Sequence, residues 1–200
     1  LYNTLDTIIW LAETGEQKKV VSMVGSLSDF FRSTLSRGKD IVTLKEELQH
    51  VRSYLEIQQV RYQDILQYEI EAPEELYLCQ IPKMTIQPLV ENALYHGIKN
   101  KRGAGRIRIR CEKENHGCRI RIEDNGIGIT KERLAQVQDG ILHKVLTGKD
   151  IYGLYNVHER IRLNFGEHYG ISIESEYGEG TVVSIFVPYV EPAEENKTES

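Results

Sequence analysis

The sequence has no long hydrophobic run and no excess of positive charge, and both absences restrict what the protein can do. None of its apolar runs approaches the roughly 18 residues that span a bilayer, and no signal-peptide pattern opens the chain. The formal net charge of −5 disfavours non-specific binding of nucleic acid, which depends on neutralising phosphates. We therefore expect no nucleic-acid partner, and membrane contact only through a region outside these 200 residues.

Cysteine is also scarce. The three cysteines, Cys79, Cys111 and Cys118, form no CxxC pair and have no metal-ligand spacing, which is typical of reduced thiols. Cys111 and Cys118 flank a predicted hairpin, but a structural disulfide between them is disfavoured. The remaining composition, 40% hydrophobic and 28% charged, is that of a folded globular chain of one or two domains.

The first third of the chain has a helical pattern. Apolar residues recur every three or four positions through residues 1–12, 20–35 and 44–65, and Thr43 with Glu46 forms a capping-box signature. The heptad-like stripes predict a helical hairpin over residues 1–66 that pairs with a second copy of the chain. The alternative is that these stripes pack on the rest of the same chain.

From about Tyr68 the period changes from helical to alternating. Residues 68–72, 106–111, 119–123, 171–176 and 182–187 read as strands, and residues 82–96, 131–137 and 154–165 read as helices. The alternation in the 106–123 hairpin predicts one solvent-exposed face. This order predicts an α+β domain over residues 67–190 with a mixed, largely antiparallel sheet. The acidic tail at 191–200 is expected to be disordered.

Four segments carry candidate chemistry, although each alone has a simpler structural explanation. Residues 88–97 place Asn92, Tyr95 and His96 on what we predict to be one helical face. Residues 123–128 place a carboxylate, Asp124, after a strand and before two glycines. Residues 152–157 are predicted to start a helix at Gly153, where free N–H groups favour anions. The fourth segment is Gly178-Glu-Gly-Thr181, and the glycine-dotted stretch 139–150 is expected to be a mobile lid.

The order of these segments resembles the Bergerat ATP-binding fold shared by DNA gyrase, Hsp90, MutL and histidine kinases. Within that group the chain looks like a sensor histidine kinase of the LytS/YesM type, because two of its segments are similar to motifs of that type: Gln87-Pro-Leu-Val-Glu-Asn-Ala93 and Asn156-Val-His-Glu-Arg-Ile161. The opening Leu1-Tyr-Asn-Thr-Leu-Asp6 is similar to the part of the family's phosphoacceptor motif that follows Pro-His-Phe. The resemblance implies a Bergerat-type α/β sandwich after the helical hairpin, with ATP and Mg²⁺ as cofactors.

The resemblance also implies roles for individual residues. Asp124 would accept the exocyclic amino group of adenine, and Gly126 and Gly128 would let the backbone approach the base. Asn92 would hold Mg²⁺ against the phosphates. The other implied roles are phosphate contacts from His96 and Lys99, a lid hinge and helix N–H groups at Gly153, Leu154 and Asn156, and a bond near adenine from Thr181. Arg160 would pair either with phosphate or with a nearby carboxylate.

Two departures from the pattern sharpen the expected function. Hydrolytic members have a water-activating glutamate four residues before the metal-binding Asn, but here that position is Pro88, which cannot accept a proton. Glu91 is adjacent to Asn92 in the sequence, so on a helix it points about 100° away from Asn92. The phosphoaccepting histidine would lie two residues before Leu1, so we predict no autophosphorylation of this piece. Asn3, one turn beyond that histidine, is a candidate for orienting water in a phosphatase reaction. His50 is expected to be an ordinary exposed helical histidine.

The sequence thus predicts the ATP-binding catalytic part of a kinase. The intact protein would phosphorylate its own histidine and pass the phosphoryl group to an aspartate on the receiver domain of a response regulator. The resemblance places this part on the cytoplasmic side of a membrane-anchored homodimer. The rival functions are a Bergerat-type ATPase and a non-catalytic nucleotide-sensing dimerisation module.

Overall fold

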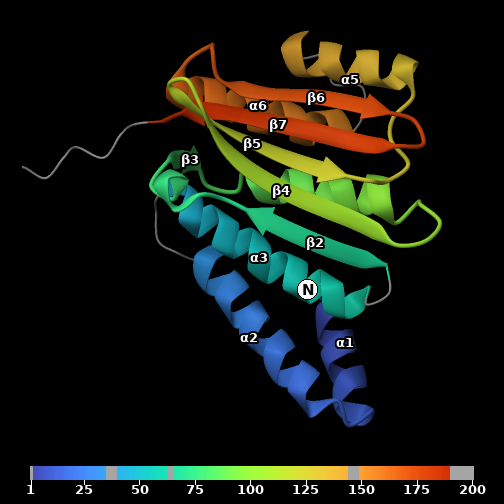
Figure 1. Cartoon of the computed structure of the whole chain (residues 1–200). Coiled ribbons are helices and arrows are strands. Elements are labelled where there is room, and N and C mark those ends of the chain that lie inside the picture. Colours follow the sequence, from blue (N-terminus) through green and yellow to red (C-terminus); the bar gives the residue numbers. More distant parts are fainter. Residues whose placement is uncertain (1, 35–39, 63–64, 144–148, 190–200) are drawn as a thin grey trace, which may run out of the picture.

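The computed structural model describes residues 2–34, 40–62, 65–143 and 149–189, in which helices cover one face of a five-stranded sheet (Figure 1). Two helices at the start of the chain extend away from this sheet (Figure 1). The helices are α1 (Tyr2–Glu13), α2 (Gln17–Thr34), α3 (Leu44–Arg61), α4 (Ile86–Asn92), α5 (Lys131–His143) and α6 (Lys149–Phe165). In the described ranges no helix is both long and apolar enough to cross a membrane.

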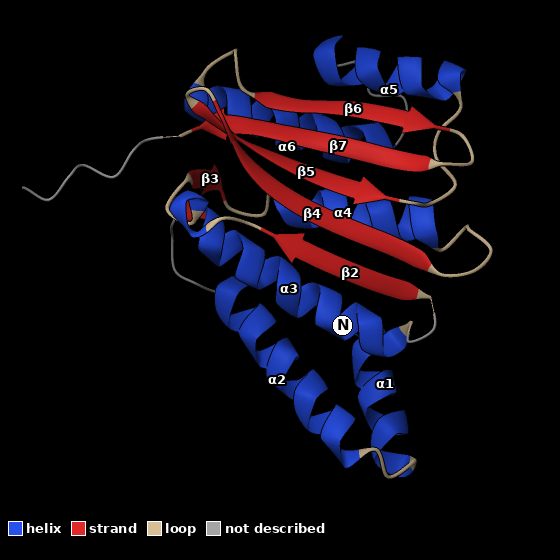
Figure 2. Ribbon diagram, viewed as in Figure 1, coloured by secondary structure: helices blue, strands red, loops and turns tan. Residues whose placement is uncertain are grey.

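The sheet is mixed and mainly antiparallel, as predicted. Its strand order is β2-β4-β5-β7-β6, and only the β2–β4 pair is parallel (Figure 2). These strands are β2 (Leu66–Glu71), β4 (Gly105–Glu114), β5 (Gly117–Asp124), β6 (Gly170–Glu176) and β7 (Gly180–Pro188). The predicted α+β class is therefore correct.

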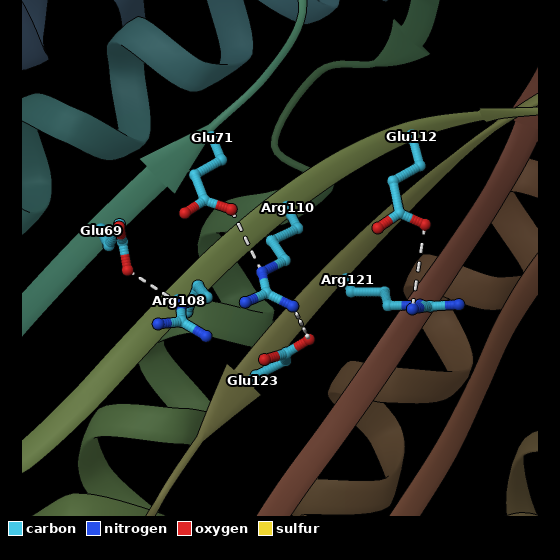
Figure 3. A network of polar contacts seen from close by, with 7 residues as sticks. All are labelled: Glu69, Glu71, Arg108, Arg110, Glu112, Arg121 and Glu123. Carbon is cyan, nitrogen blue, oxygen red and sulfur yellow. Dashed lines mark hydrogen bonds and ion pairs between the residues drawn. The ribbon is translucent and has the colours of Figure 1, made fainter.

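The sheet has one buried and one solvent-exposed face. Isoleucines of β4 and β5, including Ile109 and Ile122, point into the core under the helices. On the other face, Figure 3 shows acidic and basic side chains in a ladder across β2, β4 and β5. Arg108 pairs with Glu69 at 2.8 Å, and Arg110 pairs with Glu71 at 3.1 Å. Each exposed pair adds little stability, but the ladder confirms the prediction that this face of the sheet is exposed to solvent.

The helical third splits between two cores. The predicted capping box is present, since Thr43 and Glu46 bond each other's backbone N–H groups. The α3 stripe, represented by Leu48 and Val51, is buried in the same core as the sheet, so for α3 the intramolecular alternative is correct. A separate small cluster of Leu11, Met23 and Ile57 joins α1, α2 and α3.

The helix predicted over residues 82–96 begins later than expected. Pro82 instead ends a short strand, β3 (Gln80–Pro82), which pairs with β1 (Ile41–Thr43). Helix α4 starts at Ile86 and continues as a π-helix, η2 (Ala93–Ile98). The late start has a physical cause, because the buried Glu47 carboxylate accepts the N–H groups of residues 84, 85 and 86 and thereby fixes the first turn.

The predicted lid between residues 139 and 150 is partly wrong. Helix α5 extends to His143 instead of ending near Val137, and α6 begins at Lys149. Ile141 and Ile151 are buried, so core contacts favour helix on both sides despite the weak apolar period. Residues 144–148 and the tail at 191–200 lie outside the described residues.

The capping box gives a stability prediction. Replacing Thr43 with Ala should lower the free energy of unfolding by about 1 kcal/mol, because the Glu46 N–H loses its side-chain acceptor. Urea denaturation followed by circular dichroism measures this change. Thr7→Ala is the control, since the Thr7 hydroxyl only adds a bond to the Asn3 carbonyl within α1. An equal loss in both variants would contradict a specific role for the cap.

Candidate functional site

A pocket of about 340 Å³ lies between the helix-covered face of the sheet and helices α4, η2, α5 and α6. Most of its wall is aliphatic, from side chains such as Leu89, Ile122 and Val183. A few polar side chains enter it from different elements, namely Asn92, His96, Asn100, Asp124, Thr130, Arg133 and Thr181. Apolar walls with a small number of convergent polar groups are typical of a small-molecule site.

The Asp124 carboxylate is the acidic group on the pocket wall. It ends β5 directly opposite Thr181 of β7, and its Oδ1 accepts the Gly126 N–H at 2.8 Å. Burial raises the pKa of Asp124 to about 6, although bonds from the backbone N–H groups of Gly126 and Thr181 and the nearby Lys101 oppose this rise. A partly desolvated carboxylate of this kind favours a ligand that donates a hydrogen bond.

Glycines around Asp124 make this placement possible. A Cβ on Gly97, in the π-helix, would lie 2.6 Å from the Asp124 Oδ1, and a Cβ on Gly126 would lie 2.4 Å from the Gly97 backbone. Gly128 has a φ of +66°, and its Cβ would meet the Glu176 carbonyl oxygen at 2.0 Å. The glycines thus allow η2 and the turn after β5 to touch. Gly128 is on the pocket wall, whereas Gly126 packs behind it.

Helix α4 and its π-helical continuation present two different faces. Asn92 and His96, one turn apart, line the pocket together. Glu91 and Tyr95 line a separate cavity of about 320 Å³ against α1, α2 and α3. The prediction that Tyr95 shares the face of Asn92 is therefore wrong, and the prediction that Glu91 points away from Asn92 is confirmed.

Some residues implied by the resemblance lie away from the pocket. The Lys99 ammonium sits 4.8 Å from the centre of the Tyr95 ring and 5.4 Å from that of Tyr62, outside the pocket wall. Asn156 is exposed on α6, also outside the wall, whereas Leu154 lines it. Gly153 is the fifth residue of α6, so the expectation that it starts the helix with free N–H groups is wrong, because α6 begins one turn earlier.

Four further residues from the sequence analysis have clear positions. The Arg160 Nη2 donates to the Met84 carbonyl at 2.6 Å, and the choice between a phosphate and a carboxylate partner for Arg160 stays a prediction. Pro88 is outside the pocket wall. Asn3 lines the Glu91 cavity on the opposite side of α4. His50 is only 4% exposed, so its predicted exposure is wrong.

Sequence reasoning missed several residues of the pocket wall. These are Gly97, Asn100, Thr130, Arg133 and Tyr177. A signal for two of them exists, because Thr130, Arg133 and Val137 recur at helical spacing directly after the Asp124 turn. In the described ranges no three His, Cys, Asp or Glu side chains gather to hold a metal. The Asn92 amide oxygen can therefore supply one Mg²⁺ ligand, with the rest left to phosphates and water.

Comparison with known proteins agrees with this architecture. The model of the "Histidine kinase" family matches residues 1–66, and that of the "Histidine kinase-, DNA gyrase B-, and HSP90-like ATPase" family matches residues 82–191. The chain belongs to this ATPase family. With both matches in order along the chain, it is the ATP-binding catalytic part of a histidine kinase.

Curated relatives of this histidine kinase chain are sensor kinases. Sensor histidine kinase YesM of Bacillus subtilis is 40% identical over 94% of the chain and 31% of its own length. Sensor histidine kinase BtsS of Escherichia coli is 34% identical over 96% of the chain and 32% of its own length. Sensor protein kinase HptS of Staphylococcus aureus is 32% identical over 94% of the chain and 36% of its own length. The chain thus spans about a third of these relatives.

Solved structures support the same fold. The histidine kinase domain of a blue-light activated kinase from Erythrobacter litoralis aligns with a TM-score of 0.54 and 16% identity, over 88% of this chain and 82% of that one. The catalytic domain of histidine kinase ThkA, in a nucleotide-free form, aligns with a TM-score of 0.55 and 18% identity, over 74% and 95%. At these identities the likeness establishes the histidine kinase fold alone.

The raised pKa of Asp124 predicts how adenosine binding depends on pH. In the free protein the carboxylate takes up a proton as the pH falls through about 6. An amino group that donates to the carboxylate favours its charged form, so adenosine affinity should be constant above pH 7 and fall below pH 6. Adenosine carries no phosphate, and calorimetry between pH 5 and 8 isolates this effect.

Asp124→Asn is the matched variant for the pH experiment, since its amide does not titrate. Its adenosine affinity should be lower than that of the wild type at pH 8 and nearly independent of pH. The same pKa shift makes folding stability fall as the pH rises through about 6, because the ionised carboxylate is desolvated. A wild-type affinity that rises below pH 6 would contradict the role that the resemblance implies for Asp124.

Arg133 and Lys99 give a second prediction. Arg133 lies on the pocket wall, whereas Lys99 lies over two tyrosine rings outside it. We expect Arg133→Ala to weaken ATP and ADP binding by about tenfold, since a charge-assisted bond to phosphate is lost, and to leave adenosine binding unchanged. Lys99→Ala, the matched loss of charge, should have the smaller effect on ATP in a competition assay. The reverse order would show that Lys99 leaves its tyrosines to reach the phosphates.

Proposed function

We propose that the pocket binds Mg²⁺-ATP and that the intact protein transfers the γ-phosphoryl group to one of its own histidines and then to a response-regulator aspartate. The observation that carries this proposal is the Asp124 carboxylate, desolvated and set among aliphatic side chains beside Thr181. Its acceptor-only chemistry suits the exocyclic amino group of adenine and disfavours the carbonyl of guanine.

The other residues of the wall fit the remaining parts of the nucleotide. Asn92 and His96 enter from one helix and offer an amide oxygen to Mg²⁺ and an N–H to a phosphate oxygen. Bound Mg²⁺ would neutralise charge on the phosphates. The protein itself would hold and orient the nucleotide, since phosphoryl transfer depends mainly on positioning and electrostatics. Thr181 and Gly128 would flank the base, and Leu154 would close the lid side.

The residues near Asn92 favour phosphoryl transfer over hydrolysis of ATP. Pro88 has no group that accepts a proton, and it lies outside the pocket wall. Glu91, the adjacent carboxylate, lines the other cavity, so it does not face the nucleotide pocket. With Pro88 and Glu91 both unsuited to activate water, the proposed site would hold ATP until an acceptor histidine reaches it.

The helical region fits a dimerisation surface. Large apolar side chains of α1 and α2 are exposed, among them Ile9, Trp10 and Val21, with exposed fractions of 57%, 56% and 73%. A second copy of the chain would bury them by forming a helical bundle. In the proposed assembly this part of the protein lies on the cytoplasmic side of a membrane-anchored sensor.

The test of this proposal is nucleotide binding without turnover. The chain of 200 residues should bind Mg²⁺-ATP more tightly than Mg²⁺-GTP by about tenfold or more, because guanine places a carbonyl oxygen, an acceptor, where adenine places the amino group that donates to Asp124. Phosphate release should stay at background, since the absence of a general base lowers hydrolysis by roughly 10²–10⁴-fold. Isothermal calorimetry and a steady-state phosphate assay measure both properties.

Labelled γ-phosphate separates the rival functions. No acid-labile label should remain on residues 1–200, whereas a chain extended upstream to include Pro-His-Phe should be labelled on that histidine. Acid-labile label on His50 would show that the acceptor histidine has been assigned to the wrong position. Sustained phosphate release would favour the ATPase, and binding without labelling of the extended chain would favour the nucleotide-sensing module.

A further inference from the structure

A row of polar side chains, three of them buried, joins α3 to α4, and the nucleotide pocket does not use it. His50, Gln87 and Glu91 form a chain in which the His50 Nε2 lies 2.5 Å from the Gln87 Oε1 and the Gln87 Nε2 donates to Glu91 at 2.8 Å. One turn earlier on α3, Glu47 accepts N–H groups from residues 84–86 at 2.7–3.1 Å. We call Glu47, His50, Gln87 and Glu91 the polar seam.

Three members of the seam are buried, and Glu91 is half-buried on the cavity against α1, α2 and α3. Glu47, His50 and Gln87 are exposed by only 2%, 4% and 6%, next to fully buried leucines of both helices. Buried polar groups destabilise a fold unless their partners are correctly placed, so a satisfied network favours one relative placement of two helices over others. Because the seam bonds lie one turn apart on α3, a slip of α4 along α3 would break them.

The seam and the pocket use opposite faces of the same short helix. Glu91 ends the seam, and the next residue, Asn92, lines the pocket with His96. Rotation of α4 that releases the seam would therefore turn Asn92 out of the pocket. Asp124 belongs to β5, and its hydrogen bonds come from the N–H groups of Gly126 and Thr181. It meets the α4–η2 helix at Gly97, which has no side chain, so we expect a rotation of α4 to disturb Asp124 less than Asn92.

The seam also reaches the helical hairpin. The Phe30 ring of α2 stacks on the His50 imidazole, with centroids 4.7 Å apart and planes at 19°. A displacement of α2 would thus act on the seam through His50. The contacts form a continuous path from α2 through His50 and Gln87 to the helix that carries Asn92.

We propose that His50 and Gln87 are positioning residues that aim Asn92 and His96 into the pocket and so control the Mg²⁺-dependent part of nucleotide binding. The inference rests on the proposed ATP site. It predicts that breaking the seam separates two functions of one pocket: recognition of adenine by Asp124 persists, while the response of affinity to Mg²⁺ is lost.

The experiment compares His50→Leu and Gln87→Leu with the wild type. Calorimetry measures the affinity for adenosine, for ATP with EDTA and for ATP with Mg²⁺. In both variants Mg²⁺-ATP affinity should fall by about tenfold, the effect expected when a ligand group is misplaced, and adenosine affinity should stay within about twofold. His50→Gln, which places an N–H donor near the Nε2 position, should recover most of the Mg²⁺ response.

Two further variants separate positioning from stability. The double variant His50→Leu/Gln87→Leu leaves neither member of the pair unsatisfied, so it should regain much of the lost stability in urea but not the Mg²⁺ response. His158→Leu is the matched control, because His158 of α6 is a second buried histidine, 7% exposed, whose Nδ1 accepts the Ile171 N–H of β6, away from the seam. It should lose stability and keep the Mg²⁺ response.

The outcomes are distinct. Equal losses of adenosine and Mg²⁺-ATP affinity in the seam variants, or a Mg²⁺ response that follows stability in all variants, would show that the seam is only structural. Unchanged binding in His50→Leu and Gln87→Leu would also overturn the inference. A wild-type protein that binds neither adenosine nor Mg²⁺-ATP would instead remove the proposed function itself.

Discussion

The Asp124 carboxylate is the constraint on which the rest of the site depends. To lie on the pocket wall it needs a gap in η2, which Gly97 supplies, and a close turn, which Gly126 and Gly180 supply. It also needs the β5–β7 register that sets Thr181 opposite it. The sheet, the π-helix and the turn therefore meet at one acidic group whose pKa is raised by its own burial.

The second constraint is that α4 and its continuation η2 contact both the nucleotide pocket and helix α3. Asn92 and His96 face the pocket, whereas Gln87 and Glu91 bond toward α3. The division begins within α4, where Glu91 and Asn92 are adjacent, and continues into the π-helical turn, a feature often found at functional sites. A rotation of this helix that changes its bonds to α3 would therefore also change the position of its side chains in the pocket.

Local signals in the sequence predicted those features that are set locally. The capping box at Thr43, the alternating hairpin and the carboxylate at Asp124 depend on neighbours in the chain, and the structure has all three. The errors concern long-range packing. His50 is buried by contacts with α2 and α4, Lys99 lies over the rings of Tyr95 and of Tyr62, the residue that follows α3, and α6 starts earlier because Ile151 is buried. The partners of His50 and the Tyr62 ring are far away in the sequence.

The placement of α3 limits where motion can enter the catalytic part. Leu44, Val51 and Leu55 are fully buried with the sheet, so turning α3 against the sheet would expose a large apolar area. The buried hydrophobic cluster that α1 and α2 share with α3 is smaller and consists of Leu11, Met23 and Ile57. A movement of the α1–α2 pair against α3 would therefore expose less fully buried apolar area than a movement of α3 against the sheet. The Phe30–His50 stack lies at that boundary, and its connection to Gln87 makes it the point through which such a movement would reach Asn92.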